Sequence, residues 1–128
     1  MNEQPEIQLI ANVVARRQDG RVLFVRYHAD DERWWLPGED LEPYEHPNDR
    51  AAKTLERLGG LTVGPLTLDS VESFRGRRGW HVVFHYRAEV EGEPDGEYEG
   101  GWFAPDELPR TMHGRWEREA VARVAAQA

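Results

Sequence analysis

The chain contains no cysteine, and this absence excludes two classes of site. Disulfide cross-links and thiolate metal centres both need cysteine sulfur, so neither contributes to the fold or its chemistry. The first residues contain no long apolar run of the kind that marks a secretory signal or a membrane span. We therefore expect a soluble cytoplasmic protein with no membrane partner.

Basic residues are scarce relative to acidic ones, with 16 Lys and Arg against 24 Asp and Glu and a formal net charge of −8. Neutralising the phosphates of a nucleic acid takes clustered Lys and Arg, so this composition argues against a nucleic-acid partner. A small anionic ligand remains compatible with the charge if a metal ion or a local basic cluster receives it. The sequence contains no Ser/His/Asp arrangement and no phosphate-binding loop.

Internal repeats and low-complexity segments are also lacking, and the 128 residues suit one domain with a buried core. We therefore treat residues 1–128 as a single domain. A homodimer is compatible with this length, but the sequence itself gives no argument for one.

The apolar pattern predicts an N-terminal hairpin, formed by 7–15 and 22–27 around a turn signal at 18–21. A helix is expected to begin near Pro47, because proline suits the first helical position, where its missing N–H is not needed. The glycines at 59 and 60 are typical of a helix end.

Further extended segments are expected at 61–74, at 80–90 and near 97–103, followed by a helix over 115–126. Strands and helices in this order predict an α/β layered domain.

Residues 36–61 resemble a Nudix box. The Nudix pattern runs Gly, five residues, Glu, seven residues, then Arg-Glu-U-x-Glu-Glu-x-Gly-U, where U is a bulky aliphatic residue. The chain keeps four of the defined positions, namely Glu45, Leu55, Gly60 and Leu61. The flanking segments are also similar to the family, namely Leu36-Pro37-Gly38, Trp102-Phe103 and Asp106-Glu107-Leu108-Pro109. The resemblance covers nearly the whole chain and implies an α/β/α sandwich, with a mixed β-sheet flanked by helices.

The family's box helix presents glutamates three and four residues apart, so they share one helical face. Such a face suits magnesium, which takes oxygen ligands and can activate water for attack on a pyrophosphate. In this chain the matching positions are Thr54, Arg57 and Leu58, which cannot form that site. The resemblance therefore implies a Nudix-type hydrolase, while the residues leave its catalytic activity open.

Two further positions of the box differ from the pattern. Lys53 replaces the family's arginine, which keeps the charge but loses the planar fork of donors. Glu39 stands where the box has its first glycine, so any backbone conformation that requires a positive φ would be costly there.

Glu45 is the best candidate for inherited catalytic chemistry, although it could equally be a carboxylate that orders the loop by pairing with Lys53. One carboxylate does not make a magnesium site, so we expect no cofactor at the usual position. If the chain is an atypical hydrolase, Glu42, Glu45 and Glu99 are the carboxylates that would hold magnesium.

The replacement of carboxylates by cations gives a hypothesis of its own. Lys53 and Arg57 lie one helical turn apart and could hold phosphate directly, without a metal ion. The alternative is that Arg57 is an exposed helix cation with no ligand.

Two more residues are candidates for ligand contact. Trp34 and Trp35 precede the loop that borders the substrate in the family, and either could stack on a base. Alternation in a strand would put them on opposite faces, so at most one should face the cleft, and Trp35 is the candidate. Arg75 belongs to a basic cluster with Arg77 and Arg78, which could contact phosphate or simply solubilise a hairpin tip.

His81 and His85 would meet in a helix, but in the strand predicted here they share a face about 13 Å apart. They are therefore not expected to bind one ion.

Three functions remain open. The first is a Nudix-like domain that binds a nucleotide or related phosphorylated metabolite, with pyrophosphohydrolase activity lost or weakened. The second is an active, atypical magnesium-dependent hydrolase of nucleoside diphosphate derivatives. The third is a protein-interaction domain that reuses the fold, because a fold does not by itself define a function.

Overall fold

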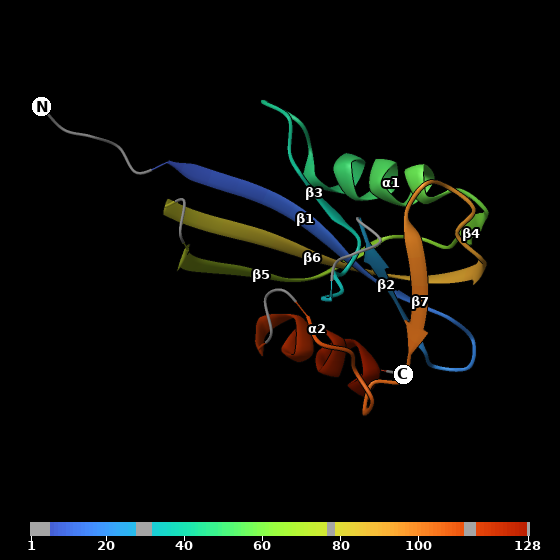
Figure 1. Cartoon of the computed structure of the whole chain (residues 1–128). Helices are drawn as coiled ribbons and strands as arrows, with labels where there is room; N and C mark the ends of the chain where they lie inside the picture. The colour runs from blue at the N-terminus through green and yellow to red at the C-terminus, as the bar shows by residue number, and fades with distance from the viewer. Residues whose placement is uncertain (1–5, 28–31, 77–78, 112–114, 128) are drawn as a thin grey trace, which may run out of the picture.

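The computed structural model describes residues 6–27, 32–76, 79–111 and 115–127. Within them it has a single mixed sheet with one helix on each face (Figure 1). The elements in chain order are β1 (Ile7–Arg16), β2 (Val22–Arg26), β3 (Gly38–Asp40), α1 (Pro47–Leu58), β4 (Leu61–Val63), β5 (Thr67–Gly76), β6 (Gly79–Gly92), β7 (Glu99–Phe103) and α2 (Arg115–Ala126).

The strands follow the order β4-β6-β1-β2-β7, with β3 added to β1 and β5 added to β6. β1 and β6 pair in parallel along the whole of β1, and the other pairs of strands are antiparallel. The layers confirm the α/β/α sandwich expected from the sequence. Neither helix is long and apolar enough to cross a membrane in the described part of the chain.

Alternation along the strands divides the core into two layers. On β1, Ala11, Val13 and Ala15 point to the side covered by α1, where they pack with the buried apolar residues of that helix. Val14 points to the opposite side and packs with Phe24 and with buried residues of α2. The position of a side chain in a strand therefore fixes which helix it meets.

The predicted box helix is confirmed as α1, with the expected start and end. The Nδ1 atom of His46 accepts a hydrogen bond from the backbone N–H of Asn48 at 3.1 Å, and Pro47 opens the helix. Gly59 ends it with a φ of 67°, a conformation that favours glycine.

The segment 61–74, predicted as one extended stretch, is two strands. β4 ends at Val63 and β5 begins at Thr67, because Pro65, which has no N–H to donate to a ladder, lies between them. A register shift between Leu68 and Ser70 follows. The predicted strand over 80–90 is confirmed within the longer β6, and His81 and His85 share one face of it, as expected.

Candidate functional site

The short strand β3 brings the start of the box beneath α1. It pairs antiparallel with β1, and Glu39 lies opposite Ala11, whose side chain is in the core under α1. The carboxylate of Glu39 therefore faces α1. Glu39 has ordinary strand backbone, because among the described non-glycine residues only Tyr44 has a positive φ. The replacement of the family's glycine by Glu39 therefore causes no backbone strain.

Gly38 precedes Glu39 and lies against the side chain of Asn12, its partner in the ladder. A Cβ atom at position 38 would lie 1.8 Å from Asn12 Oδ1. We expect Gly38→Ala to lower the free energy of unfolding by about 1–3 kcal/mol, the usual cost of overpacking. Urea denaturation tests this expectation. A neutral Gly38→Ala would contradict the close approach.

Glu45 is held by two cations of α1. Its carboxylate accepts from Arg50 Nε at 2.7 Å and from the terminal Nη2 at 3.0 Å, and Lys53 Nζ lies 3.2 Å away. It also accepts from the backbone N–H of Glu42 at 3.0 Å. The pairing of Glu45 with Lys53, one of the two interpretations of Glu45, is present in the structure, but the fork of Arg50 makes the stronger contact.

These contacts stabilise the ionised form of Glu45. The hydrogen bonds from Arg50, followed by that from the Glu42 backbone, lower the pKa of Glu45 to about 2. The carboxylate is a fixed negative charge at neutral pH, and it is already committed to protein donors. It is therefore a poor general base, since a base is most effective with a pKa near the working pH.

Glu39 is the second carboxylate of this network. Arg57 donates to its Oε2, the Thr54 hydroxyl lies 2.8 Å from its Oε1, and Arg50 Nη1 lies 3.4 Å from the same oxygen. Arg57 also approaches the hydroxyl of Tyr98 at 3.4 Å. We call Glu39, Glu45, Arg50, Lys53 and Arg57 the box ion network. It contains three cations and two carboxylates.

Magnesium does not fit the residues present here. Leu58 is 3% exposed and belongs to the core, Thr54 is buried, and Arg57 carries a positive charge at the third glutamate position of the pattern. The carboxylates of the network are bound to guanidinium and ammonium groups, which leaves no free set of oxygens. Among the described residues, no group of three or more His, Asp or Glu could hold a metal ion.

A cavity of about 140 Å³ lies beside the box ion network and reaches α2. Its aromatic wall consists of Tyr27, Trp35 and Trp116, and its polar wall consists of Asn12, Glu39, Asp40 and Glu117. The Tyr27 hydroxyl lies 3.2 Å from the carbonyl of Gly38, and burial raises its pKa to about 12. Tyr27 therefore stays neutral and acts here as a hydrogen-bonding, apolar wall.

Glu117 closes the other side of this cavity. It is buried in the first turn of α2 and accepts a hydrogen bond at 2.8 Å from the backbone N–H of Leu36. This hydrogen bond joins α2 to the segment that leads into the box. Because the Glu117 carboxylate is buried, losing the bond would be costly, and it therefore holds Leu36 in place.

The structure separates the remaining predicted site residues. Trp35 lines the cavity, whereas Trp34 packs on the α2 side of the core, as alternation predicted. Glu42 is exposed, and Glu99 pairs with Arg26 across β7 and β2. Glu42, Glu45 and Glu99 thus form no metal cluster.

Arg75 is not brought to the cavity. It lies near the end of β5 opposite Trp80, where the hairpin with β6 turns. Arg77 and Arg78, which the sequence grouped with it, are outside the described residues.

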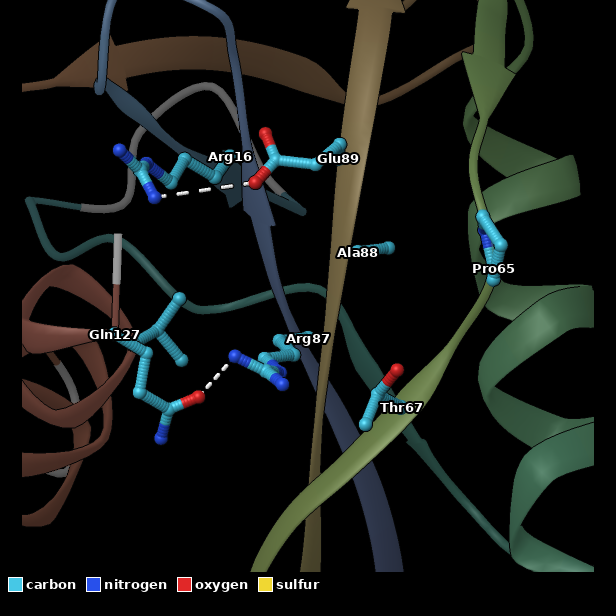
Figure 2. A pocket seen from close by; sticks show the side chains of 8 residues that line it. Arg16, Pro65, Thr67, Arg87, Ala88, Glu89 and Gln127 are labelled. Atoms are coloured by element: carbon cyan, nitrogen blue, oxygen red, sulfur yellow. Dashed lines mark hydrogen bonds and ion pairs between the residues drawn. The ribbon is translucent and has the colours of Figure 1, made fainter.

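A second, larger cavity of about 300 Å³ lies at the other end of the sheet, near the end of α2 (Figure 2). Figure 2 shows two arginines in its lining, each with a partner. Arg16 lies 3.9 Å from Glu89, and Arg87 donates to Gln127. None of the predicted site residues lines this cavity, so it serves as a comparison site within the same molecule.

Sequence reasoning missed the roles of Glu39, Arg50, Tyr98 and Glu117. For Arg50 a signal existed, because Arg50, Lys53 and Arg57 follow helical spacing and share one face of α1. The role of Glu39 depends on the pairing of β3, that of Glu117 on the docking of α2, and that of Tyr98 on where β7 begins.

Comparisons with known proteins agree with this fold. The family model described as the NUDIX domain matches residues 7–124, so the chain belongs to the Nudix family. No curated protein sequence matches the chain.

Several solved structures share the fold. A MutT Nudix hydrolase from Burkholderia pseudomallei is 25% identical, with a TM-score of 0.75, and the match covers 93% of this chain and 98% of that one. A Nudix hydrolase from Nitrosomonas europaea is 15% identical, with a TM-score of 0.76 and coverage of 95% and 90%. An ADP-ribose pyrophosphatase from Streptococcus suis is 20% identical, with a TM-score of 0.67 and coverage of 94% and 90%. The last two likenesses concern the fold alone.

Proposed function

We propose that this Nudix-family protein binds a nucleotide or a related small phosphorylated metabolite beside α1, with magnesium-dependent pyrophosphohydrolase activity lost or weakened. The observation that carries this proposal is the box ion network. Glu39 and Glu45 neutralise cations of α1 and are not free to bind a metal ion.

The adjoining cavity suits one planar ring. At about 140 Å³ it is below the size of a pocket for a whole drug-sized ligand, but an apolar cavity of about 150 Å³ is known to accept benzene. Tyr27, Trp35 and Trp116 offer aromatic surface, and Asn12 offers both a donor and an acceptor. A nucleobase would fill this space and leave its sugar and phosphates outside it.

The phosphates would then meet the cations of the network. Lys53 and Arg57 keep 57% and 50% of their side chains exposed, and the network carries one positive charge in excess. A diphosphate would compete with Glu39 and Glu45 for these donors without needing a metal ion.

Removing Arg57 tests the phosphate contact. We expect the Kd of ADP, measured by calorimetry in the presence of EDTA, to rise roughly 10-fold to 100-fold in Arg57→Ala, the value of a charge-assisted hydrogen bond. The matched control is Arg87→Ala, which removes an arginine from the cavity of Figure 2 and should leave the Kd unchanged. No binding by the parent, binding that EDTA abolishes, or a larger loss in Arg87→Ala would each overturn the proposal.

A hydrolysis assay with magnesium separates binding from turnover. Nucleotide sugars, dinucleoside polyphosphates, nucleoside triphosphates and nucleotide cofactors form the panel. ADP-ribose is added to it because one structural neighbour is an ADP-ribose pyrophosphatase. We expect binding without turnover. Turnover that Glu45→Gln abolishes would instead favour the atypical hydrolase.

A further inference from the structure

A group of large apolar side chains is left exposed at one end of the sheet. Each exposes between 40% and 50% of its surface. We call this group the apolar sheet face, and it consists of Ile7, Leu9, Leu68, Val71 and Trp80.

The strand registers place these side chains on one face. Ile7 pairs with Trp80 across β1 and β6, and Leu9 follows Ile7 at the next position of the same side. Val71 pairs with Phe84, and Leu68 pairs with Tyr86, both of which pack in the core on the α1 side. The apolar sheet face is therefore a continuation of the core surface that α1 covers elsewhere.

α1 does not extend far enough to cover this end. Its apolar residues meet the later halves of β1 and β6, from Ala11 and Phe84 onward. Figure 1 shows β1, β5 and β6 extending past the start of α1, with α2 on the opposite face. A hollow of about 400 Å³ lies beside Trp80 at this end, lined also by Ser73, Arg75 and Gly79.

The lack of carboxylates on the described part of this face is compatible with a second copy of the chain as its occupant. Among the described residues that share this side of β1, β5 and β6 around the patch, Arg75 is charged and none is a carboxylate. Each chain carries a net charge of −8, so two copies repel each other over most of their surfaces. The apolar sheet face is a place where two copies can approach without bringing carboxylates together.

We propose that the apolar sheet face is the interface of a homodimer, in which the same face of two copies packs around a twofold axis. Side chains of this size at half exposure present roughly 400–500 Å² of apolar surface, which is within the range of the largest apolar patch on a typical monomer, a patch that is often functional. A stable dimer buries about 800 Å² on each partner, with an apolar centre and a polar rim. The patch supplies that centre, and the hollow beside Trp80 can receive a side chain of the second copy. This interface does not depend on the ligand site proposed above.

Sedimentation velocity of the full chain, from low micromolar to submillimolar concentration, tests the interface. The parent is expected at twice the 14.8 kDa mass of one chain. Val71→Glu is expected to raise the dimer dissociation constant by about 100-fold or more, because a twofold interface buries the new charge twice. Val63→Glu, the same change at an exposed valine on β4, is the matched control and should stay dimeric.

Because the chain lacks cysteine, a single introduced thiol gives a second test. Ser73 lies next to the apolar sheet face, on the same side of β5 as Val71, and Ser73→Cys is expected to yield a covalent dimer with a short bis-maleimide. Thr62→Cys on β4 is expected to yield none. Circular dichroism checks that Val71→Glu remains folded, and Leu68→Lys replaces it if it does not. A parent that stays monomeric throughout, or disruption by Val63→Glu and not by the changes on the face, would overturn the proposal.

Discussion

The free energy of unfolding is expected to fall by about 3–5 kcal/mol when Leu58 is replaced by Glu, which restores the family's residue at that position. Leu58 is 3% exposed and packs with Leu55, Tyr86 and Val90. The variant loses this apolar burial and places a carboxylate among apolar side chains of the core. Urea denaturation followed by circular dichroism measures the loss.

Leu58→Met is the control, because it nearly conserves the volume and should cost less than about 1.5 kcal/mol. A loss below about 1 kcal/mol in Leu58→Glu would mean that α1 can turn this position toward solvent. The helix could then present a carboxylate as the family does, and our conclusion that magnesium does not fit would have to be revised.

The residues on the two sides of α1 differ from those of the helix in the Nudix pattern. Thr54 and Leu58 lie on its buried side, while Arg50, Lys53 and Arg57 lie on the side facing the box loop. Restoring one glutamate would therefore not rebuild a metal site. The cations would still neutralise Glu39 and Glu45.

The sequence predicted most of the elements, apart from β3 and the division of 61–74 into β4 and β5, and the family resemblance supplied the arrangement of the layers. Helical spacing between Pro47 and Leu58, with proline at the start and glycine after the end, defines α1 through local interactions alone. Alternation likewise predicted that Trp34 and Trp35 point to opposite sides of the fold. These features depend on residues close in sequence, so one chain contains enough information for them.

The ion network could not be predicted in this way. Arg57 meets Glu39 across 18 positions of sequence, and the meeting requires β3 to pair with β1 in one register. A register shifted by one residue would turn Glu39 to the other face of the sheet. The cations of α1 and the pairing of Glu45 with Lys53 could be inferred from the sequence, but the carboxylate of Glu39, which binds Arg57, could not.

The exposure of the apolar sheet face could not be predicted from the sequence either. Alternation shows that Ile7 and Leu9 share a side with Ala11, but it does not show where α1 ends above them. Whether such a side is core or surface depends on how two distant elements dock. A structure is needed to recognise it.

A buried histidine on the α2 side gives the second large effect. His85 is fully buried, and neither ring nitrogen has a hydrogen-bond partner among the described residues. Glu72 lies 3.8 Å from its Nε2, and Arg123 of α2 binds both Glu72 and Asp69. The ring of Trp116 packs 5.2 Å from it. Burial lowers the pKa of His85, and the attraction of Glu72 offsets this only in part.

The protein is therefore expected to lose stability as the pH falls below 6.5, the ordinary pKa of histidine. Between pH 6.5 and the lowered pKa of His85, the unfolded chain binds a proton at this histidine and the folded chain does not. The free energy of unfolding therefore falls as the pH falls through this range. The slope can reach about 1.4 kcal/mol per pH unit.

Urea denaturation between pH 7 and pH 5 measures this slope. His85→Gln, which removes the titrating ring, is expected to flatten the dependence, even if it lowers stability at pH 7. If His85→Gln and the parent lose stability in parallel, the acid sensitivity arises from other groups and the buried ring is not its source.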